Sequence, residues 1–371
     1  MIIIINNGKV FMKRPTLLSF GFAAFFLIGT GEVSASERHF TFNYESPVLQ
    51  SGGMELETYS TFRFGRELFY SALDQRLEFE AGLGGGVQTS LYLNFTQEMA
   101  DDGTGTVSSS FLADGISNEW KFKLKDNLTD DFGLGLYLEA AAKPDELELE
   151  GKIIIDKRAG NFLWTFNLTN EPEYHLIDGT WGYSLIPSLG AGFFLVPERF
   201  FLGVEIQNDN FYEGQPLQNT RSLISAGPVL SYTGDSWWVT LTLLPQLWNL
   251  RGSSLDLDDS QRVQVRLAAS LSLDGRSPSA NAASSPFLPI PDEEAAKNPS
   301  NREHASLDDL KAGRDLILQR CIRCHGLHSP DEFSREGWEK IMNRMQIKAG
   351  LDETMRNSVL GYLSVFSREG K

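Results

Sequence analysis

The segment ELELEGKIIID, residues 146–156, decides the fold. In it Glu146, Glu148 and Glu150 alternate with Leu147, Leu149 and Gly151. Successive side chains on a strand point to opposite faces, so this spacing predicts a β-strand with one charged and one apolar face. The same alternation recurs at residues 76–83, 91–95, 120–125, 162–168 and 263–273.

About a dozen such segments lie between residues 39 and 273. Residue pairs that favour turns separate them, namely Asp102-Gly103, Asp114-Gly115, Pro144-Asp145, Asp178-Gly179 and Gly234-Asp235. No helical pattern of ~10–15 residues intervenes, and parallel strands would need such crossovers. The sequence therefore predicts an antiparallel all-β domain of about twelve strands.

Alternation alone does not say whether the apolar face points inward or outward. Segments of ~9–11 residues match a tilted strand that crosses a bilayer. Aromatic residues near segment ends suit an interfacial girdle, namely Trp181, Tyr183, Phe200, Phe201, Trp237 and Trp238. We also expect Lys121 and Lys123 to pair with Glu148 and Glu150 inside a narrow lumen. These features indicate that residues 36–273 form a transmembrane-type antiparallel barrel. A soluble sandwich or lipocalin-like barrel is the alternative.

Two stretches carry a resemblance to known proteins. NEWKFKLKD (118–126), taken with LELEGKIIIDK (147–157), resembles a poorly characterised group of bacterial outer-membrane barrels. The resemblance implies a location and a fold, with outer-membrane lipid around the barrel. It implies no substrate.

The first 35 residues read as a signal peptide. Met12-Lys13-Arg14 is basic, residues 17–28 are apolar, and Val33-Ser34-Ala35 supplies small residues for cleavage. The apolar core is shorter than the ~20 residues that a membrane helix needs. The sequence therefore predicts export, with cleavage after Ala35.

Composition excludes several functional classes. The 371 residues carry a net charge of −16, which disfavours nucleic-acid binding. Two cysteines rule out a disulfide framework. No G-x-S-x-G, Walker or G-x-G-x-x-G motif is present, so we expect no enzyme.

Residues 274–305 are rich in Pro, Ser and Ala and predict a flexible linker. The motif C-x-x-C-H follows, formed by Cys321, Cys324 and His325. Two thiols at this spacing can attach covalently to one haem, and the histidine can then bind its iron. A redox dithiol would need a βαβ pattern, and a zinc site would need a second ligand pair. The motif predicts one haem c.

Helix signals surround the motif. Ser306 with Asp309 predicts a cap for a helix over residues 307–320, and Asp352 predicts the start of a last helix. With W-x-x-x-x-x-R-M (338–345) and G-Y-L (361–363), residues 306–371 resemble small bacterial mono-haem cytochromes c. The resemblance implies a small all-α domain in which Gly313 meets Tyr362 where the first and last helices cross.

The second axial ligand of the iron stays open. The family pattern implies Met345, the methionine after arginine, with Met342 as the alternative. His304, His328, Met355 or a vacant position are the remaining choices. A helical stripe that contains two methionines is often simply part of a core.

Three functions follow from these predictions. The first is electron transfer by a periplasmic cytochrome tethered to an outer-membrane barrel, with a periplasmic redox protein or a multi-haem cytochrome as partner. The second is an outer-membrane channel with an accessory haem domain. The third is a haem enzyme or sensor with an open distal site.

Overall fold

The computed structural model describes two large parts of the chain and a short segment near its beginning. The described residues are 5–6, 9–10, 38–49, 51–127, 130–197, 199–214, 216–234, 236–258, 260–273, 288–299, 301, 305–321 and 328–368. Near the beginning, Ile5–Asn6 (β1) pairs with Lys9–Val10 (β2). The basic and apolar parts of the predicted signal peptide lie outside the described residues.

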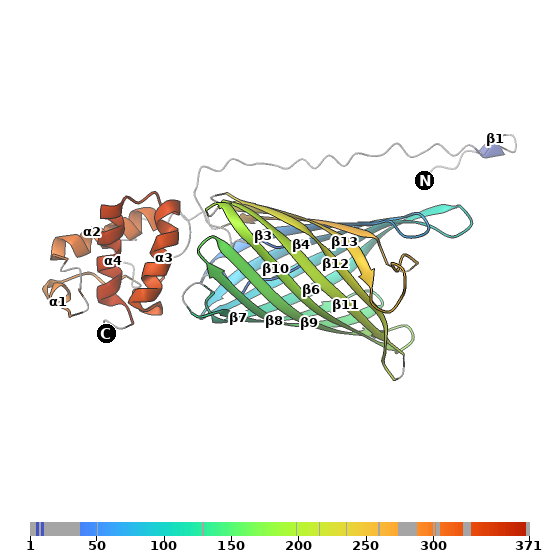
Figure 1. The fold of residues 1–371 in the computed structure, drawn as a ribbon, viewed down its shortest axis with the longest axis horizontal. Coiled ribbons are helices and arrows are strands. Elements are labelled where there is room, and N and C mark those ends of the chain that lie inside the picture. The colour runs from blue at the N-terminus through green and yellow to red at the C-terminus, as the bar shows by residue number, and fades with distance from the viewer. Residues whose placement is uncertain are drawn as a thin grey trace. The chain divides into compact units, whose positions relative to one another are not determined.

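Twelve antiparallel strands close into a barrel in chain order, and β14 pairs with β3 to complete the ring (Figure 1). This confirms the predicted fold class and strand number. The strands are β3 (Met54–Phe64), β4 (Tyr70–Gly84), β5 (Val87–Asp101), β6 (Val107–Lys125), β7 (Gly133–Ala142), β8 (Glu146–Ala159), β9 (Phe162–His175), β10 (Trp181–Val196), β11 (Phe200–Glu213), β12 (Gln218–Thr233), β13 (Trp237–Asn249) and β14 (Val263–Ser272).

The two ends of the barrel differ. Because the strand number is even, β3 begins and β14 ends at the same end, which we call the terminal end. Most connections there are short, such as 85–86 and 160–161. The opposite end, which we call the loop end, carries the connection 250–262.

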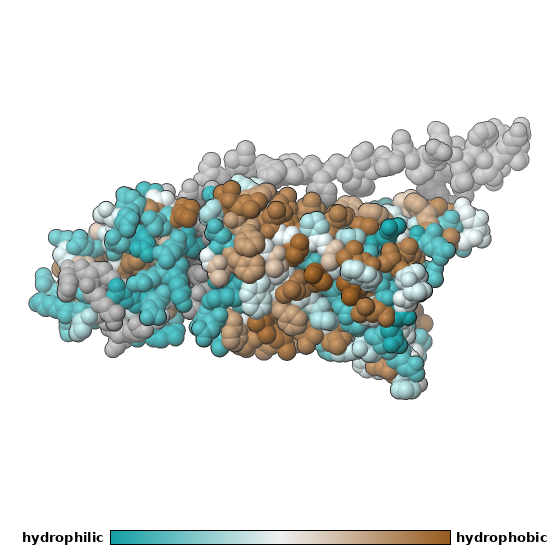
Figure 2. Space-filling model, viewed as in Figure 1, coloured by the Kyte–Doolittle hydropathy of each residue, from teal (hydrophilic) through white to brown (hydrophobic). Residues whose placement is uncertain are grey.

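The barrel is apolar outside and charged inside. Leu149 on β8 is 60% exposed, whereas Glu80 on β4 is 4% exposed and Glu55 on β3 is fully buried. Figure 2 shows apolar residues gathered over the barrel strands. A soluble barrel would bury its apolar face, so this distribution excludes the soluble alternatives.

One predicted turn and part of the predicted aromatic girdle are wrong. Asp114-Gly115 is not a turn but lies within β6, where the register against β5 shifts between Asn94 and Phe95. Gly115 has a φ of 99°, so the glycine serves a bulge instead of a hairpin. Phe201 and Trp238 do not belong to a girdle, because both are buried. Each follows another aromatic residue, and adjacent strand residues must face opposite ways.

The C-terminal part is helical. It contains α1 (Glu293–Ala296), α2 (Leu307–Arg320), the 3₁₀ helix η3 (Pro330–Glu332), α3 (Arg335–Lys348) and α4 (Glu353–Phe366). Ser306 and Asp309 form the predicted capping box of α2, and Asp352 caps α4 as expected. Within the described parts of the chain, no helix is both long and apolar enough to span a bilayer.

Helices α2 and α4 cross at close range. A Cβ built on Gly313 would lie 2.1 Å from the Ser358 carbonyl oxygen and 3.0 Å from the Tyr362 Cβ. Only glycine therefore permits this approach, which is the contact that the sequence led us to expect. Trp338, Met342, Val359 and Leu363 belong to the core beside it.

Part of the predicted linker belongs to this helical part. Leu288 is 1% exposed and joins the same core. Its carbonyl oxygen accepts a hydrogen bond from Arg314 Nε (3.3 Å), and the Pro289 carbonyl accepts one from the Tyr362 hydroxyl (2.8 Å). The described residues of 288–305 thus fold against α2 and α4, so they are not a free spacer. The composition of the segment did not predict this packing, because isolated residues between prolines make the contacts.

Candidate functional site

Residues 38–49, which we call the lumen segment, lie inside the barrel. Their polar contacts reach Gln88 on β5, Asp156 on β8, Asn167 on β9, Glu205 on β11 and Thr240 on β13. A single short segment can touch strands all around the ring only from within it. Gln88 and Asp156 lie near short turns of the terminal end, so the segment occupies that half of the lumen.

Glu205 holds the middle of the lumen segment. Its carboxylate accepts hydrogen bonds from three successive backbone N–H groups, those of Thr41 (3.2 Å), Phe42 (2.9 Å) and Asn43 (2.8 Å). The Asn43 side-chain amide (3.0 Å) and the Thr242 hydroxyl (2.6 Å) also donate to it. Glu205 is 1% exposed. Its buried charge is therefore balanced by donors from the segment, which form an anion-binding nest.

The second half of the lumen segment is bound by two amide side chains and one carboxylate of the barrel wall. Asn167 exchanges two hydrogen bonds with the backbone of Tyr44, at 2.6 and 3.0 Å. Asp156 Oδ2 accepts from the Ser46 N–H (3.2 Å), and Gln88 Oε1 accepts from the Leu49 N–H (2.8 Å). Lumen side chains thus supply the partners that the backbone of an extended segment would otherwise lack.

Apolar packing adds to these contacts around Phe40. Phe40 is fully buried and packs edge to face with Phe201, at a ring-centroid distance of 5.2 Å. Gly190 on β10 makes this possible, because a Cβ there would come within 2.7 Å of the Phe40 ring. The barrel wall is therefore shaped to receive this residue.

The lumen wall carries an excess of acidic residues. Among the described strand residues, nine buried acids face three buried bases. The acids are Glu55, Glu57, Glu78, Glu80, Glu119, Glu139, Asp156, Glu205 and Asp209, and the bases are Lys121, Lys152 and Arg158. The predicted pairing of Lys121 and Lys123 with Glu148 and Glu150 is wrong. Instead Lys143, in the connection before β8, pairs with Glu148 (2.5 Å), and Lys152 pairs with Glu150 (2.6 Å) two residues earlier on the same strand. Lys123 pairs with Asp126 (3.2 Å).

In the helical part, the structure brings several predicted site residues together. Cys321 follows the last residue of α2 and packs against the core. Met342 on α3 is a core residue that is 2% exposed, and Met345 is partly buried against the same core. Cys324 and His325 lie outside the described residues, as does His304. The haem c, its Cys321 and Cys324 attachment and its axial ligands His325 and Met345 stay predictions.

His328 is engaged on one side. Its Nδ1 lies 2.7 Å from Glu332 Oε2 at the end of η3. Burial raises the pKa of Glu332, but the His328 imidazole and the Ser329 backbone N–H outweigh it, so the pKa lies below its usual range. This contact orients the His328 ring through Nδ1 and explains its position without an iron.

These features define the class of the protein. A closed, even-stranded antiparallel barrel with an apolar exterior and a charged interior is a β-barrel of the outer-membrane type. The chain belongs to a family of unknown function, DUF6662, whose profile matches residues 32–176 and 183–273. No curated protein matches the chain.

Several solved structures are similar to the chain at low sequence identity. The KdgM porin in complex with disordered oligogalacturonate is 10% identical with a TM-score of 0.37, and the match covers 58% of this chain and 98% of that one. The NanC porin is 11% identical with a TM-score of 0.38 and the same coverage. The translocator domain of the autotransporter NalP from Neisseria meningitidis is 9% identical with a TM-score of 0.35, covering 60% of this chain and 88% of that one.

Sequence reasoning missed the lumen segment and Glu205. The segment FNYESP (42–47) has no regular apolar period, and its partners are more than a hundred residues away in the chain. Glu205 reads as one of many strand glutamates. The one available signal is indirect. Between the expected cleavage point and β3 lie 18 residues (36–53), and a barrel does not need so long a segment before its first strand.

Proposed function

We propose that the protein is an outer-membrane channel whose lumen segment holds it closed. The observation that carries this proposal is the charged lumen with residues 38–49 inside it, bound mainly through side chains of the wall. None of these contacts is a strand pairing, so the segment can leave while the barrel's own hydrogen-bond ladder stays complete.

The proposed orientation follows from the connections. Bacterial barrels of this type have short periplasmic turns and longer external loops. The terminal end would therefore face the periplasm and the loop end the exterior. The lumen segment would then close the periplasmic half, and the helical part would be periplasmic.

Solute flux tests the channel proposal. The full chain and a variant that lacks residues 38–49 are reconstituted into liposomes loaded with a small charged dye. We expect little efflux with the full chain and rapid efflux with the deletion variant. Heat-modifiable migration on gels, which reports a folded barrel, is the control. A folded deletion variant without efflux would show that the barrel is an anchor and not a channel.

A second function, electron transfer by the helical part, is favoured by a separate observation. The approach of Gly313 to Tyr362 and the position of Cys321 at the end of α2 support this proposal, because both agree with the resemblance to mono-haem cytochromes c. In this proposal Cys321 and Cys324 attach the haem, His325 and Met345 hold its iron, and Trp338 helps to exclude water. The haem supplies a one-electron redox couple, and two protein ligands leave no open position for substrate chemistry.

Its proposed partner is a periplasmic redox protein or a separate multi-haem cytochrome, because one haem offers no relay across the bilayer. Acid denaturation of the purified protein tests the cofactor. We expect haem to remain with the chain in wild type and to be lost in Cys324→Ala. Complete extraction of haem from wild type by organic solvent would overturn the attachment. Success or failure of this test leaves the channel proposal untouched.

A further inference from the structure

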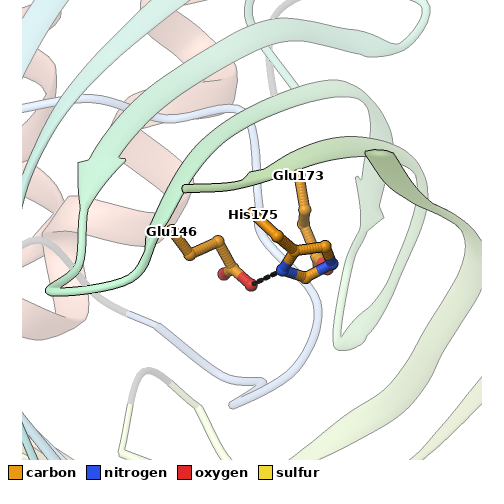
Figure 3. Close-up of side chains that lie close together, drawn as sticks. All are labelled: Glu146, Glu173 and His175. Carbon is orange, nitrogen blue, oxygen red and sulfur yellow. Dashed lines mark ion pairs between the residues drawn. The ribbon is translucent and has the colours of Figure 1, made fainter. Parts of the chain in front are cut away.

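A cluster of three side chains lies at the loop end of the barrel, away from the lumen segment. Glu146 begins β8, and Glu173 and His175 lie at the end of β9. One ligand atom from each lies within 4.8 Å of the other two. Figure 3 shows the three side chains close together, with the His175 ring facing the Glu146 carboxylate. The His175 Nδ1 atom lies 3.2 Å from Glu146 Oε2.

Strand register builds this cluster. Glu146 is directly opposite His175 in the β8–β9 ladder, and Glu148 is opposite Glu173. Residues two apart on a strand share one face, so Glu173 and His175 project to the same side. The ligand atoms are therefore positioned by hydrogen-bonded backbone and not by a loop, which is the arrangement that a specific site needs.

Gly182 on β10 keeps a space open beside the cluster. It is opposite Glu173 in the β9–β10 ladder. A Cβ at this position would lie 3.1 Å from Glu173 Oε2 and 3.4 Å from His175 Nε2. A side chain at this position would therefore contact both atoms, and glycine leaves that position beside the cluster without one.

Further acidic side chains lie beside the cluster and favour the binding of a cation there. Glu148 and Glu171 lie beside Glu173, with one oxygen of each of the three within 4.8 Å of the others. Lys143 also lies here, and its Nζ contacts Glu146 (2.7 Å) and Glu148 (2.5 Å). Neighbouring carboxylates repel one another when ionised, and a bound cation would relieve this repulsion.

We propose that Glu146, Glu173 and His175 bind a divalent transition-metal ion of the Zn²⁺ class at the outer rim of the barrel. An imidazole nitrogen with two carboxylates suits Zn²⁺ and not the all-oxygen sites of Ca²⁺. Metal bonds of roughly 2.0–2.2 Å need the ligand atoms closer than 4.8 Å, which small side-chain rotations provide. Lys143 would keep its contact with Glu148.

Titration calorimetry with Zn²⁺ tests the site on the full chain in detergent, purified without a histidine tag. We expect one ion per barrel at the rim. His175→Ala and Glu173→Gln should each weaken binding by at least about tenfold, since even partners outside the metal shell contribute roughly 10–100-fold. Glu213→Gln, at the same end of the barrel but on β11, is the matched control and should bind as wild type does.

Two controls keep the result interpretable. Heat-modifiable migration shows that each variant still forms a barrel. The Cys321→Ser/Cys324→Ser chain removes the thiols as an alternative ligand pair and should retain the rim site. The proposal is wrong if the wild-type chain binds no Zn²⁺ in the micromolar range. It is equally wrong if His175→Ala, folded, binds as tightly as wild type, because the cluster would then be a structural ion pair.

Discussion

Asn43 donates its backbone N–H to Glu205 at 2.8 Å, the shortest of the three backbone hydrogen bonds that this carboxylate accepts from the lumen segment. The two residues lie 162 positions apart in the chain. A buried carboxylate without these donors would be strongly destabilised. Glu205 and the segment therefore stabilise each other, and the proposed closure of the channel depends on this contact.

Glu205→Gln should loosen the segment without unfolding the barrel. The amide keeps the shape but loses the charge, and a hydrogen bond to a charged group contributes ~1.5–3 kcal/mol. Hydrogen exchange at the amides of Thr41, Phe42 and Asn43 should accelerate by about tenfold or more. The matched control is Asp209→Asn, because Asp209 is buried on the same strand but its carboxylate, among the described residues, accepts a side-chain hydrogen bond from Gln207 alone. Equal hydrogen-exchange rates at these amides in both variants would show that Glu205 does not hold the lumen segment.

The opened lumen should prefer cations. Nine buried acids against three buried bases line the described strands, and rings of carboxylates select cations. In a variant that lacks residues 38–49, the reversal potential in a KCl gradient should lie toward the potassium equilibrium potential. Glu78→Gln combined with Glu80→Gln should reduce the preference. A preference for chloride would contradict the assignment of these residues to the pore wall.

Gly313→Ala should destabilise the helical part, because the added methyl group would lie 2.1 Å from the Ser358 carbonyl oxygen. Overpacking of this kind typically costs ~1–3 kcal/mol. Gly361→Ala is the matched control, since its Cβ would meet only Ala305 Cβ at 3.5 Å. Hydrogen exchange of α2 and α4 in the full chain should speed up in the first variant and stay unchanged or slow in the second. If both variants behave alike, the crossing is not a close one.

If Met345 binds the iron of the proposed haem, Met345→Leu should abolish the thioether–iron charge-transfer absorption of the oxidised form and lower its potential. Met342→Leu should leave both unchanged, because Met342 is a core residue and leucine conserves its volume. Leucine is the better probe at both positions, since alanine at Met342 would open a cavity and destabilise the fold. Loss of the absorption in Met342→Leu alone would reverse the assignment.

Much of the fold was predictable from local patterns. Period-two alternation in segments such as 146–156 predicts the strands, and the Ser306 and Asp352 caps predict two helix starts. Alternation is the same whether the apolar face points into the barrel or out of it. The length of the segments and the positions of the aromatic residues were needed to predict that it points outward. Gly115 shows a further limit, since a glycine with positive φ serves a bulge and a turn equally well.

The candidate sites were predictable only where their residues are neighbours in sequence. C-x-x-C-H is such a local pattern. Glu205 with Asn43, and Glu146 with His175, are brought together by strand register and by the path of the lumen segment. No local propensity encodes these pairings, so only the structure shows the place of the lumen segment and the cluster of Glu146, Glu173 and His175.

In the proposed function, residues 38–49 close an otherwise open channel. The most direct test of this closure is single-channel recording with the deletion variant in a planar bilayer, followed by addition of a synthetic peptide with the sequence of residues 38–49. We predict steady conductance that the peptide blocks when added at the terminal end, and no block by a peptide with Asn43 and Phe40 changed to Ala and Ser. A deletion variant that is folded but does not conduct, or a conductance that the peptide does not affect from either side, would contradict the account.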